Sequence, residues 1–272
     1  MEAPDTTRFQ LIVHYDGSAF RGWQFQPDQR TVQGDLQAAL STLADAPTTV
    51  IGSGRTDTGV HATGQVASVD MPARWTTEKL RKAMNATLPR EIWVESVRRA
   101  ALDFHPRYDA VARRYTYRVG LDEHAQSPFQ RSQCWALGEA LDRERLASSA
   151  ERLLGRHSFE AFAKAGQPER GYECVVAAAV WTDWELGVRF DITADRYLHH
   201  MVRYLVGTMV DIARHRRPAT DLAALLTASG GLTTSPPAPP EGLFLTHVEY
   251  PESTLLADEP PASSPTRSTA TA

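Results

Sequence analysis

The sequence predicts an α+β fold made of two similar halves, each a largely antiparallel sheet with helices packed on one face. In several segments apolar residues recur at every second position, as in half-buried strands. Other segments carry apolar residues at helical spacing. The two kinds of segment do not alternate regularly, as they would in a parallel sheet built from strand–helix–strand units. We expect the halves to comprise residues 1–105 and 106–250, meeting near 102–112.

The first half is expected to combine three strands with two helices. Residues 9–15 are apolar at every second position, which predicts a strand. Residues 32–43 place Val and Leu side chains on one helical stripe, and Thr31 stands where it can cap that helix. The remaining elements are expected as strands at 66–69 and 92–97 with a short helix at 77–86 between them.

The second half begins with a strand at 115–119, where aromatic and apolar residues alternate with Arg114, Thr116 and Arg118. One face of this strand is therefore aromatic and the other basic. The later elements are expected as helices at 142–154, closed by Gly155, and at 197–212, with strands at 175–181, 188–192 and 242–250. Residues 251–272 are rich in Pro, Ser, Thr and Ala without aromatic residues, which predicts a disordered tail.

The composition is that of a globular protein without a disulfide framework or a zinc motif. The 272 residues are 42% hydrophobic and 23% charged, which excludes wholesale disorder. Cys134 and Cys174 are widely separated, which indicates a reducing compartment. The N-terminus does not resemble a signal peptide, and the longest apolar run, 175–181, is far shorter than the roughly 18 residues that span a bilayer. We therefore expect a soluble, cytoplasmic protein without membrane association.

Positive charge is concentrated in two segments, although the formal net charge of the chain is −4. Residues 98–118 contain six arginines and two aspartates, a local charge of +4. Residues 196–217 contain five arginines and one aspartate, again +4. Such clusters are either solvated faces or contacts to a phosphate-bearing partner, and two of them in an acidic chain favour the partner.

The densest group of reactive residues is the glycine-rich segment 51–62, which presents Arg55 and Asp57 two positions apart. An aspartate in such a loop often forms a turn with its own backbone. A phosphate-binding loop would require a GxGxxG or GxxxxGK[ST] pattern, which the segment lacks. The triplet 57–59, Asp-Thr-Gly, fits an aspartic peptidase only if a second chain supplies the other carboxylate. The remaining interpretation is a carboxylate nucleophile that an arginine keeps ionised.

Five motifs, in the same order along the chain, resemble those of the tRNA pseudouridine synthase A family. They are Tyr15–Gln24 with Thr31–Leu36, Gly54–Ala62 with Gly64–Val66, Ala112–Tyr117, Leu198–Arg203 with Val206–Gly207, and Gly242–Leu245. The resemblance implies a homodimeric isomerase that converts uridine to pseudouridine in the anticodon arm of tRNA, at position 38, 39 or 40. It implies no cofactor and no catalytic metal. We expect the catalytic cleft to lie between the two halves.

The resemblance assigns roles position by position. Asp57 matches the catalytic aspartate, and Arg55 matches the arginine of the same loop that is associated with base flipping. Tyr115 matches the tyrosine that stacks on the target base, and Arg203 matches the arginine that pairs with the aspartate. The sequence departs from the family pattern at Thr58, Pro106 and Tyr204. Because Tyr204 directly follows Arg203, it could change the orientation of that arginine.

Other polar residues are expected around this site. Arg113 and Arg114 are predicted to contact phosphates, and Gln24 to contact the substrate. His199 and His200 are adjacent on a predicted helix, where side chains point about 100° apart, so they are not expected to bind one metal ion together. The alternative function is a catalytically silent RNA-binding module that uses the same basic clusters.

Overall fold

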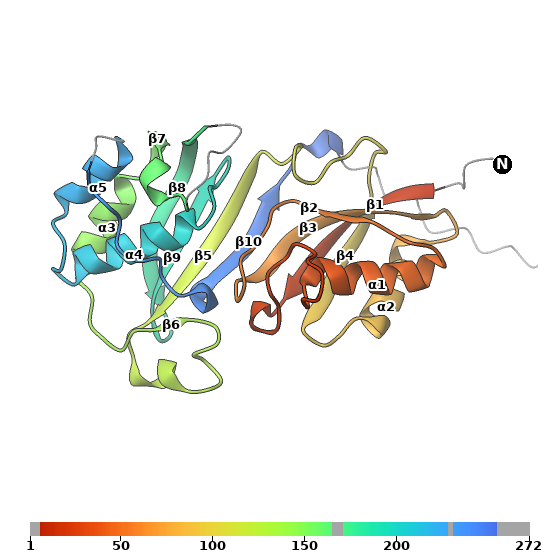
Figure 1. The fold of residues 1–272 in the computed structure, drawn as a ribbon, viewed down its shortest axis with the longest axis horizontal. Helices are drawn as coiled ribbons and strands as arrows, with labels where there is room; N and C mark the ends of the chain where they lie inside the picture. Colours follow the sequence, from red (N-terminus) through yellow and green to blue (C-terminus); the bar gives the residue numbers. More distant parts are fainter. Residues whose placement is uncertain (1–5, 165–170, 228–230, 255–272) are drawn as a thin grey trace, which may run out of the picture.

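The computed structural model describes residues 6–164, 171–227 and 231–254, and its strands form one continuous sheet (Figure 1). The order across the sheet is β4-β1-β3-β10-β5-β9-β8-β7, with β2 beside β3 and β6 beside β5. The strands are β1 (Thr6–Tyr15), β2 (Val50–Gly52), β3 (His61–Pro72), β4 (Ile92–Arg99), β5 (Ala112–Gly120), β6 (Trp135–Ala136), β7 (Gly155–Ser158), β8 (Glu173–Trp184), β9 (Gly187–Ala194) and β10 (Leu243–Glu249). The helices are α1 (Val32–Ala44), α2 (Thr77–Thr87), α3 (Arg143–Glu151), α4 (Met201–Ala213) and α5 (Thr220–Leu226).

The prediction of a mixed α and β fold with a mostly antiparallel sheet is confirmed. The pairs β3–β10 and β5–β6 are parallel, and the other strand pairs are antiparallel. The expectation of a separate sheet in each half is wrong. Strand β10 pairs with β3 through Phe244 and His61 and with β5 through Leu245 and Tyr115, so it joins the two sets of strands into one sheet.

Two predicted helices differ from the observed ones at their ends. Asp142 caps α3 by accepting a hydrogen bond from the backbone N–H of Arg145, but the helix ends at Glu151 rather than near 154. Helix α4 begins at Met201 rather than at 197, because His200 takes a left-handed conformation with φ 64°. In the described part of the chain, no helix is long and apolar enough to cross a membrane.

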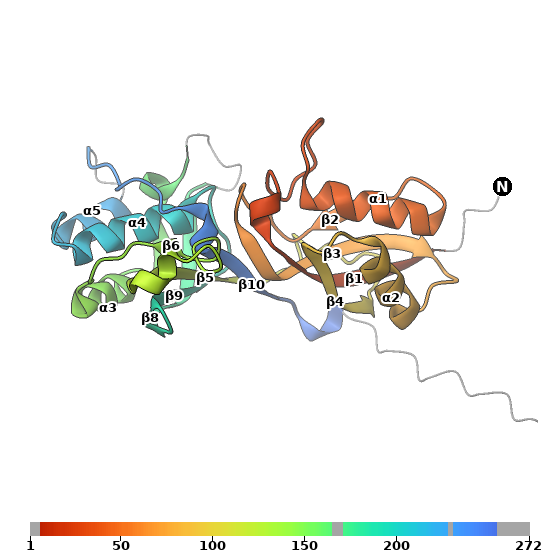
Figure 2. The ribbon, with the colours of Figure 1, turned by 90° about the horizontal axis from the view of Figure 1, so that it is seen from below.

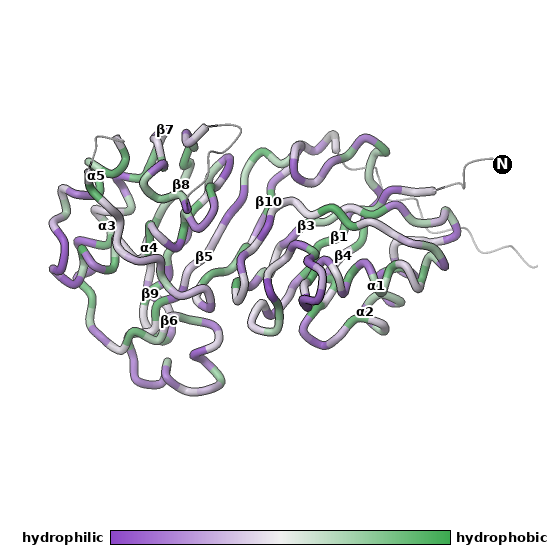
Figure 3. The backbone as a smooth tube through the Cα atoms, in the orientation of Figure 1, coloured by the Kyte–Doolittle hydropathy of each residue, from purple (hydrophilic) through white to green (hydrophobic). Residues whose placement is uncertain are grey.

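Apolar side chains form two hydrophobic clusters, one at each end of the sheet. Figure 2 shows α1 and α2 beside the N-terminal strands and α3, α4 and α5 beside the C-terminal strands. In Figure 3, hydrophobic stretches accordingly occur toward both ends of the sheet. Leu245 of β10 belongs to the N-terminal cluster and Leu243 to the C-terminal cluster, while Tyr115 packs against both. Tyr115 therefore marks the boundary between the two clusters.

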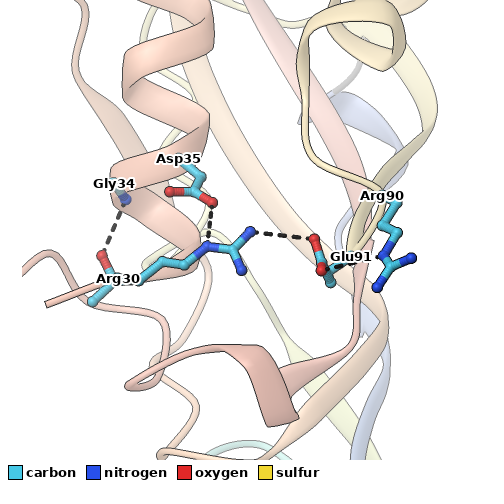
Figure 4. A network of polar contacts seen from close by, with 6 residues as sticks. Arg30, Gly34, Asp35, Arg90 and Glu91 are labelled. Atoms are coloured by element: carbon cyan, nitrogen blue, oxygen red, sulfur yellow. Dashed lines mark hydrogen bonds and ion pairs between the residues drawn. The ribbon is translucent and has the colours of Figure 1, made fainter.

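The loop that leads into α1 is fixed by caps and surface ion pairs. The Thr31 side chain accepts a hydrogen bond from the N–H of Gly34, which confirms the predicted cap. Figure 4 shows Arg30 between two carboxylates, with Nε 3.1 Å from Asp35 and Nη2 3.2 Å from Glu91. Exposed pairs of this kind contribute at most about 1 kcal/mol each. Their effect here is to hold the end of the loop that carries Gln24.

Candidate active site

Asp57 lies on the loop between β2 and β3, and buried contacts fix that loop on its inner side. The Thr56 hydroxyl lies 2.8 Å from the Tyr15 hydroxyl in a buried hydrogen bond. The Thr56 carbonyl accepts a hydrogen bond from the N–H of Trp23, and the Asp57 carbonyl accepts one from the N–H of Val60. The backbone on both sides of the carboxylate is therefore held in one conformation.

A buried glutamine from β3 completes this support. The Gln65 side chain is fully buried, and its Nε2 donates to the Gly54 carbonyl at 2.9 Å. Its Oε1 accepts from the Ser53 hydroxyl at 2.7 Å. Gln65 belongs to one of the motifs that carry the family resemblance, but no role was predicted for it. The available signal was an amide among strand residues that are otherwise apolar, since a buried amide needs hydrogen-bond partners.

Three nitrogen-bearing side chains from the start of α4 meet the Asp57 carboxylate. Nε2 of His199 lies 3.2 Å from Oδ1, and Nε2 of His200 lies 3.2 Å from Oδ2. Nη1 of Arg203 lies 3.5 Å from Oδ2. The Asp57 side chain is 23% exposed. The carboxylate thus contacts side chains from the start of α4 rather than forming an isolated turn with its own backbone.

The expected divergence of His199 and His200 is wrong. These residues lie in a turn before α4 rather than on the helix, and their rings pack with centroids 4.2 Å apart. The left-handed backbone of His200, rare for a residue with a side chain, directs both Nε2 atoms to one carboxylate. The nitrogen and oxygen atoms lie within 4.8 Å of one another, so they could share a divalent cation. The charge of Arg203 on the same carboxylate opposes a cation there.

His200 meets the carboxylate as a neutral imidazole. Burial lowers its pKa, which outweighs the opposite effect of the Asp57 charge, and the charges of Arg203, His199 and Lys164 lower it further. The carboxylate therefore has the imidazole of His200 against it and receives a hydrogen bond from Nη1 of Arg203.

Arg203 is oriented by the loop that precedes β10. Its Nε donates to the Ala238 carbonyl at 2.7 Å, and the Ala238 N–H donates back to the Arg203 carbonyl at 2.9 Å. Gly207, one turn along α4, permits this approach, because a Cβ there would lie 2.1 Å from the Pro236 carbonyl oxygen. The ring of Tyr204 lies 6.2 Å from that of His200. The Arg203 side chain thus takes its direction from Ala238.

Tyr115 lies on β5 and packs edge-on against Tyr197, with ring centroids 4.8 Å apart. Burial raises the pKa of Tyr115 to about 12; the charge of Arg113 lowers it and the charge of Asp57 raises it further. The phenol is therefore protonated at neutral pH. It offers a half-buried ring and a hydroxyl donor within the electrostatic influence of the Asp57 carboxylate.

The two arginines predicted to contact phosphates lie in different environments. Arg113 donates four hydrogen bonds to the backbone carbonyls of Ala110, Asp195, Ser53 and Arg107. Its guanidinium therefore connects the loop that carries Asp57 to segments from the other end of the sheet. Arg114 is exposed and points to the opposite face of β5 from Tyr115, with Nε 3.3 Å from the Thr193 hydroxyl.

Arg55 and Gln24 lie at the solvent side of the same loops. Arg55 is exposed, two residues before Asp57, and among the described residues it makes no ion pair. Gln24 is half-buried and donates from Nε2 to Oε1 of Gln33 at 2.8 Å. The structure therefore brings Asp57, Arg203 and Tyr115 together and leaves Arg55 exposed to solvent.

Comparisons with known proteins agree with the resemblance of the sequence motifs. A family model described as tRNA pseudouridine synthase matches residues 11–109 and 149–251. The chain belongs to the tRNA pseudouridine synthase family. This family consists of isomerases that act on uridine in tRNA. The matched segments contain Asp57 and Arg203, whereas Tyr115 lies between them.

Curated relatives cover almost the whole chain. A protein of Azorhizobium caulinodans named tRNA pseudouridine synthase A is 38% identical over 261 residues, 93% of this chain and 98% of its own length. A protein of Moorella thermoacetica with the same name is 39% identical over 243 residues, 89% of this chain and 98% of its own. The similarity therefore includes the β5 segment that the family model leaves out.

Proposed function

We propose that this chain isomerises uridine to pseudouridine in the anticodon arm of tRNA, at position 38, 39 or 40. The observation that carries the proposal is the Asp57 carboxylate, which meets His200 and Arg203 close to Tyr115. Family membership supplies the reaction class. The anticodon arm and its positions rest on the resemblance of the motifs.

The reaction needs no electron or group from outside. The N1–C1′ bond of uridine breaks, the uracil turns, and a new bond joins C5 to C1′. A proton leaves C5 and N1 ends with one, so atoms and electrons balance within the nucleoside. In the proposed mechanism Asp57 attacks the base or the sugar, or moves a proton at the sugar.

The residues around Asp57 are assigned to orienting the carboxylate and to displacing and stacking the base. Arg203 donates a hydrogen bond to Asp57, and His200 lies against the same carboxylate, so we assign them the orientation of the carboxylate for the reaction. Extruding a base from its stack costs a few kcal/mol, and stacking on an aromatic ring returns roughly 1–3 kcal/mol. We assign that stacking to Tyr115 and the displacement of the base to Arg55.

The same proposal includes a catalytic cleft between the halves 1–105 and 106–250 and a homodimeric assembly. Contacts between Asp57 and residues 199–203 across the two hydrophobic clusters support the cleft. The basic segments 98–118 and 196–217 supply charge for phosphates. A cytoplasmic location is consistent with Cys134 and Cys174, which are free and buried.

The experiment is to treat total unmodified tRNA with the protein and map the new pseudouridines. We expect them at positions 38 to 40, and none with Asp57→Asn, which should still bind tRNA with nearly unchanged affinity. Pseudouridine elsewhere in tRNA would overturn the assigned positions. Binding without any modification would favour the silent RNA-binding module.

A further inference from the structure

The segment between β4 and β5 presents an exposed aromatic ring on a tightly held turn. Tyr108 is 67% exposed. One side of its ring packs on the ring of His105, with centroids 4.3 Å apart, and the guanidinium carbon of Arg107 lies 5.7 Å from the ring centre. An exposed ring beside a positive charge is the combination that binds unpaired nucleobases, since the ring stacks and the charge attracts the phosphate.

The backbone of this turn is fixed although the ring is exposed. The N–H groups of Tyr108 and Asp109 both donate to the His105 carbonyl, and Nδ1 of His105 accepts from the N–H of Arg107 at 3.2 Å. The Asp109 carboxylate accepts from the N–H of His105 at 2.8 Å. The Tyr250 hydroxyl donates to the Pro106 carbonyl at 2.6 Å, which ties the turn to the end of β10 (Figure 1). An aromatic ring held in place before binding loses little conformational freedom on contact with a ligand.

The turn is also connected to the candidate active site. One nitrogen of Arg113, Nη2, donates to the Arg107 carbonyl at 2.7 Å and to the Ser53 carbonyl at 3.1 Å. Arg107 directly precedes Tyr108, and Ser53 begins the loop that carries Asp57. The exposed ring and the catalytic loop are thus held by the same guanidinium.

We propose that Tyr108, backed by His105 and flanked by Arg107, is a stacking platform for an unpaired base of the RNA substrate, separate from the base that reacts. This inference rests on the proposed function, because it takes tRNA as the substrate. The platform adds affinity and register outside the reacting centre. Its loss therefore weakens RNA binding and leaves the chemical step intact.

The test measures RNA affinity and turnover for Tyr108→Ala, Tyr108→Phe and Phe129→Ala in the full chain. Phe129 is the matched control, an aromatic side chain that is 85% exposed on a different turn. With an unmodified tRNA transcript, Tyr108→Ala should raise Kd and KM about tenfold, the lower part of the range for a lost base stack, and leave kcat within twofold. Tyr108→Phe and Phe129→Ala should leave all three within twofold. A melting temperature within 2 °C of wild type, expected for an exposed side chain, shows that Tyr108→Ala is folded.

A second measurement identifies the contact as stacking. Anticodon stem-loop RNAs with one abasic site at each loop position in turn should bind wild type more weakly at one position besides that of the reacting uridine, and at that position Tyr108→Ala should add no further loss. An unchanged Kd for Tyr108→Ala overturns the platform. Equal losses at every abasic position overturn it as well. If wild type binds tRNA without isomerising it, the proposed function fails while these affinities still decide the platform.

Discussion

The two sides of the candidate active site are built differently. On the side of β1 and β3, buried neutral groups hold the Asp57 loop, with Gln65 and the Tyr15–Thr56 pair at its centre. On the side of α4, a partly exposed set of nitrogen-bearing side chains meets the carboxylate, led by His200 and Arg203. We infer that the neutral side fixes where the carboxylate is, and the basic side places a positive charge beside it. Changes on the two sides should therefore affect different observables.

The largest effect is expected on the basic side. Arg203→Ala removes the cation next to Asp57 and should lower kcat about a hundredfold or more, as the loss of a charged partner in an active site does. The binding of tRNA should change less than kcat, because affinity comes from many phosphate contacts and Arg203 contacts the carboxylate. The measurement is kcat, KM and Kd with an unmodified tRNA transcript.

Arg216→Ala is the matched control for kcat, since this arginine lies just beyond α4 and faces Glu139 rather than Asp57. Its kcat should lie within twofold of wild type. A kcat near that of wild type in Arg203→Ala would show that the reaction does not need the cation beside Asp57.

The next effect is expected on the neutral side. Gln65→Leu removes the donor to the Gly54 carbonyl and the acceptor of the Ser53 hydroxyl in a buried place, which should lower the free energy of unfolding by about 1–3 kcal/mol. Misplacement of the loop should lower kcat about tenfold. A loss of kcat as large as that of Arg203→Ala would remove the distinction between the two sides.

Gly207→Ala separates the direction of Arg203 from its charge. The added Cβ would meet the Pro236 carbonyl oxygen at 2.1 Å, so the loop that carries Ala238 must move away. Overpacking of this kind costs about 1–3 kcal/mol of unfolding free energy. We expect a severalfold loss of kcat, smaller than that of Arg203→Ala because the cation is still present. Thermal unfolding and steady-state kinetics check both parts, and wild-type activity in this variant would show that Ala238 does not direct Arg203.

The smallest effect concerns the pH dependence of stability on the neutral side. Burial lowers the pKa of His61, and its Nδ1 accepts from the N–H of Gly17 at 3.1 Å, so the folded state contains the neutral ring. The unfolded state binds the proton first. His61 therefore contributes full stability above its unfolded pKa of about 6.5 and loses it progressively as the pH falls toward the lower folded pKa.

His61→Asn tests this, because the Asn side-chain oxygen can replace Nδ1 as the acceptor. Denaturant unfolding at pH 7.5 and 5.5 should show a smaller loss of stability in the variant than in wild type. Equal losses in both would exclude His61 as the source.

The sequence predicted local structure well where one pattern determines it. The alternation in 9–15 and 115–119 and the cap at Thr31 all depend on neighbours a few residues away. The single sheet was not predictable in this way, because β10 joins β3 through residues about 180 positions apart. The short strands β2 and β6 contain too few residues to show a period.

The candidate site shows the same division. The resemblance of motifs named Asp57 and Arg203, and the structure places them 3.5 Å apart. The resemblance assigned no catalytic role to His199 and His200. Tyr197 and Met201 keep a helical spacing, so the sequence does not reveal the turn between them, which the left-handed backbone of His200 creates. Gln65 was missed since its importance depends on the loop packed above it rather than on its neighbours in the sequence.

The most direct test of the central claim follows the hydrogen at C5 of uracil. In tRNA labelled with tritium at C5 of uridine, wild type should release one tritium to water for each pseudouridine formed, with no change in RNA length. Asp57→Asn should release none while binding the same tRNA. Absence of label release by wild type from every tRNA with uridine in the anticodon arm, or equal release by Asp57→Asn, would contradict the assignment of Asp57 as the catalytic carboxylate.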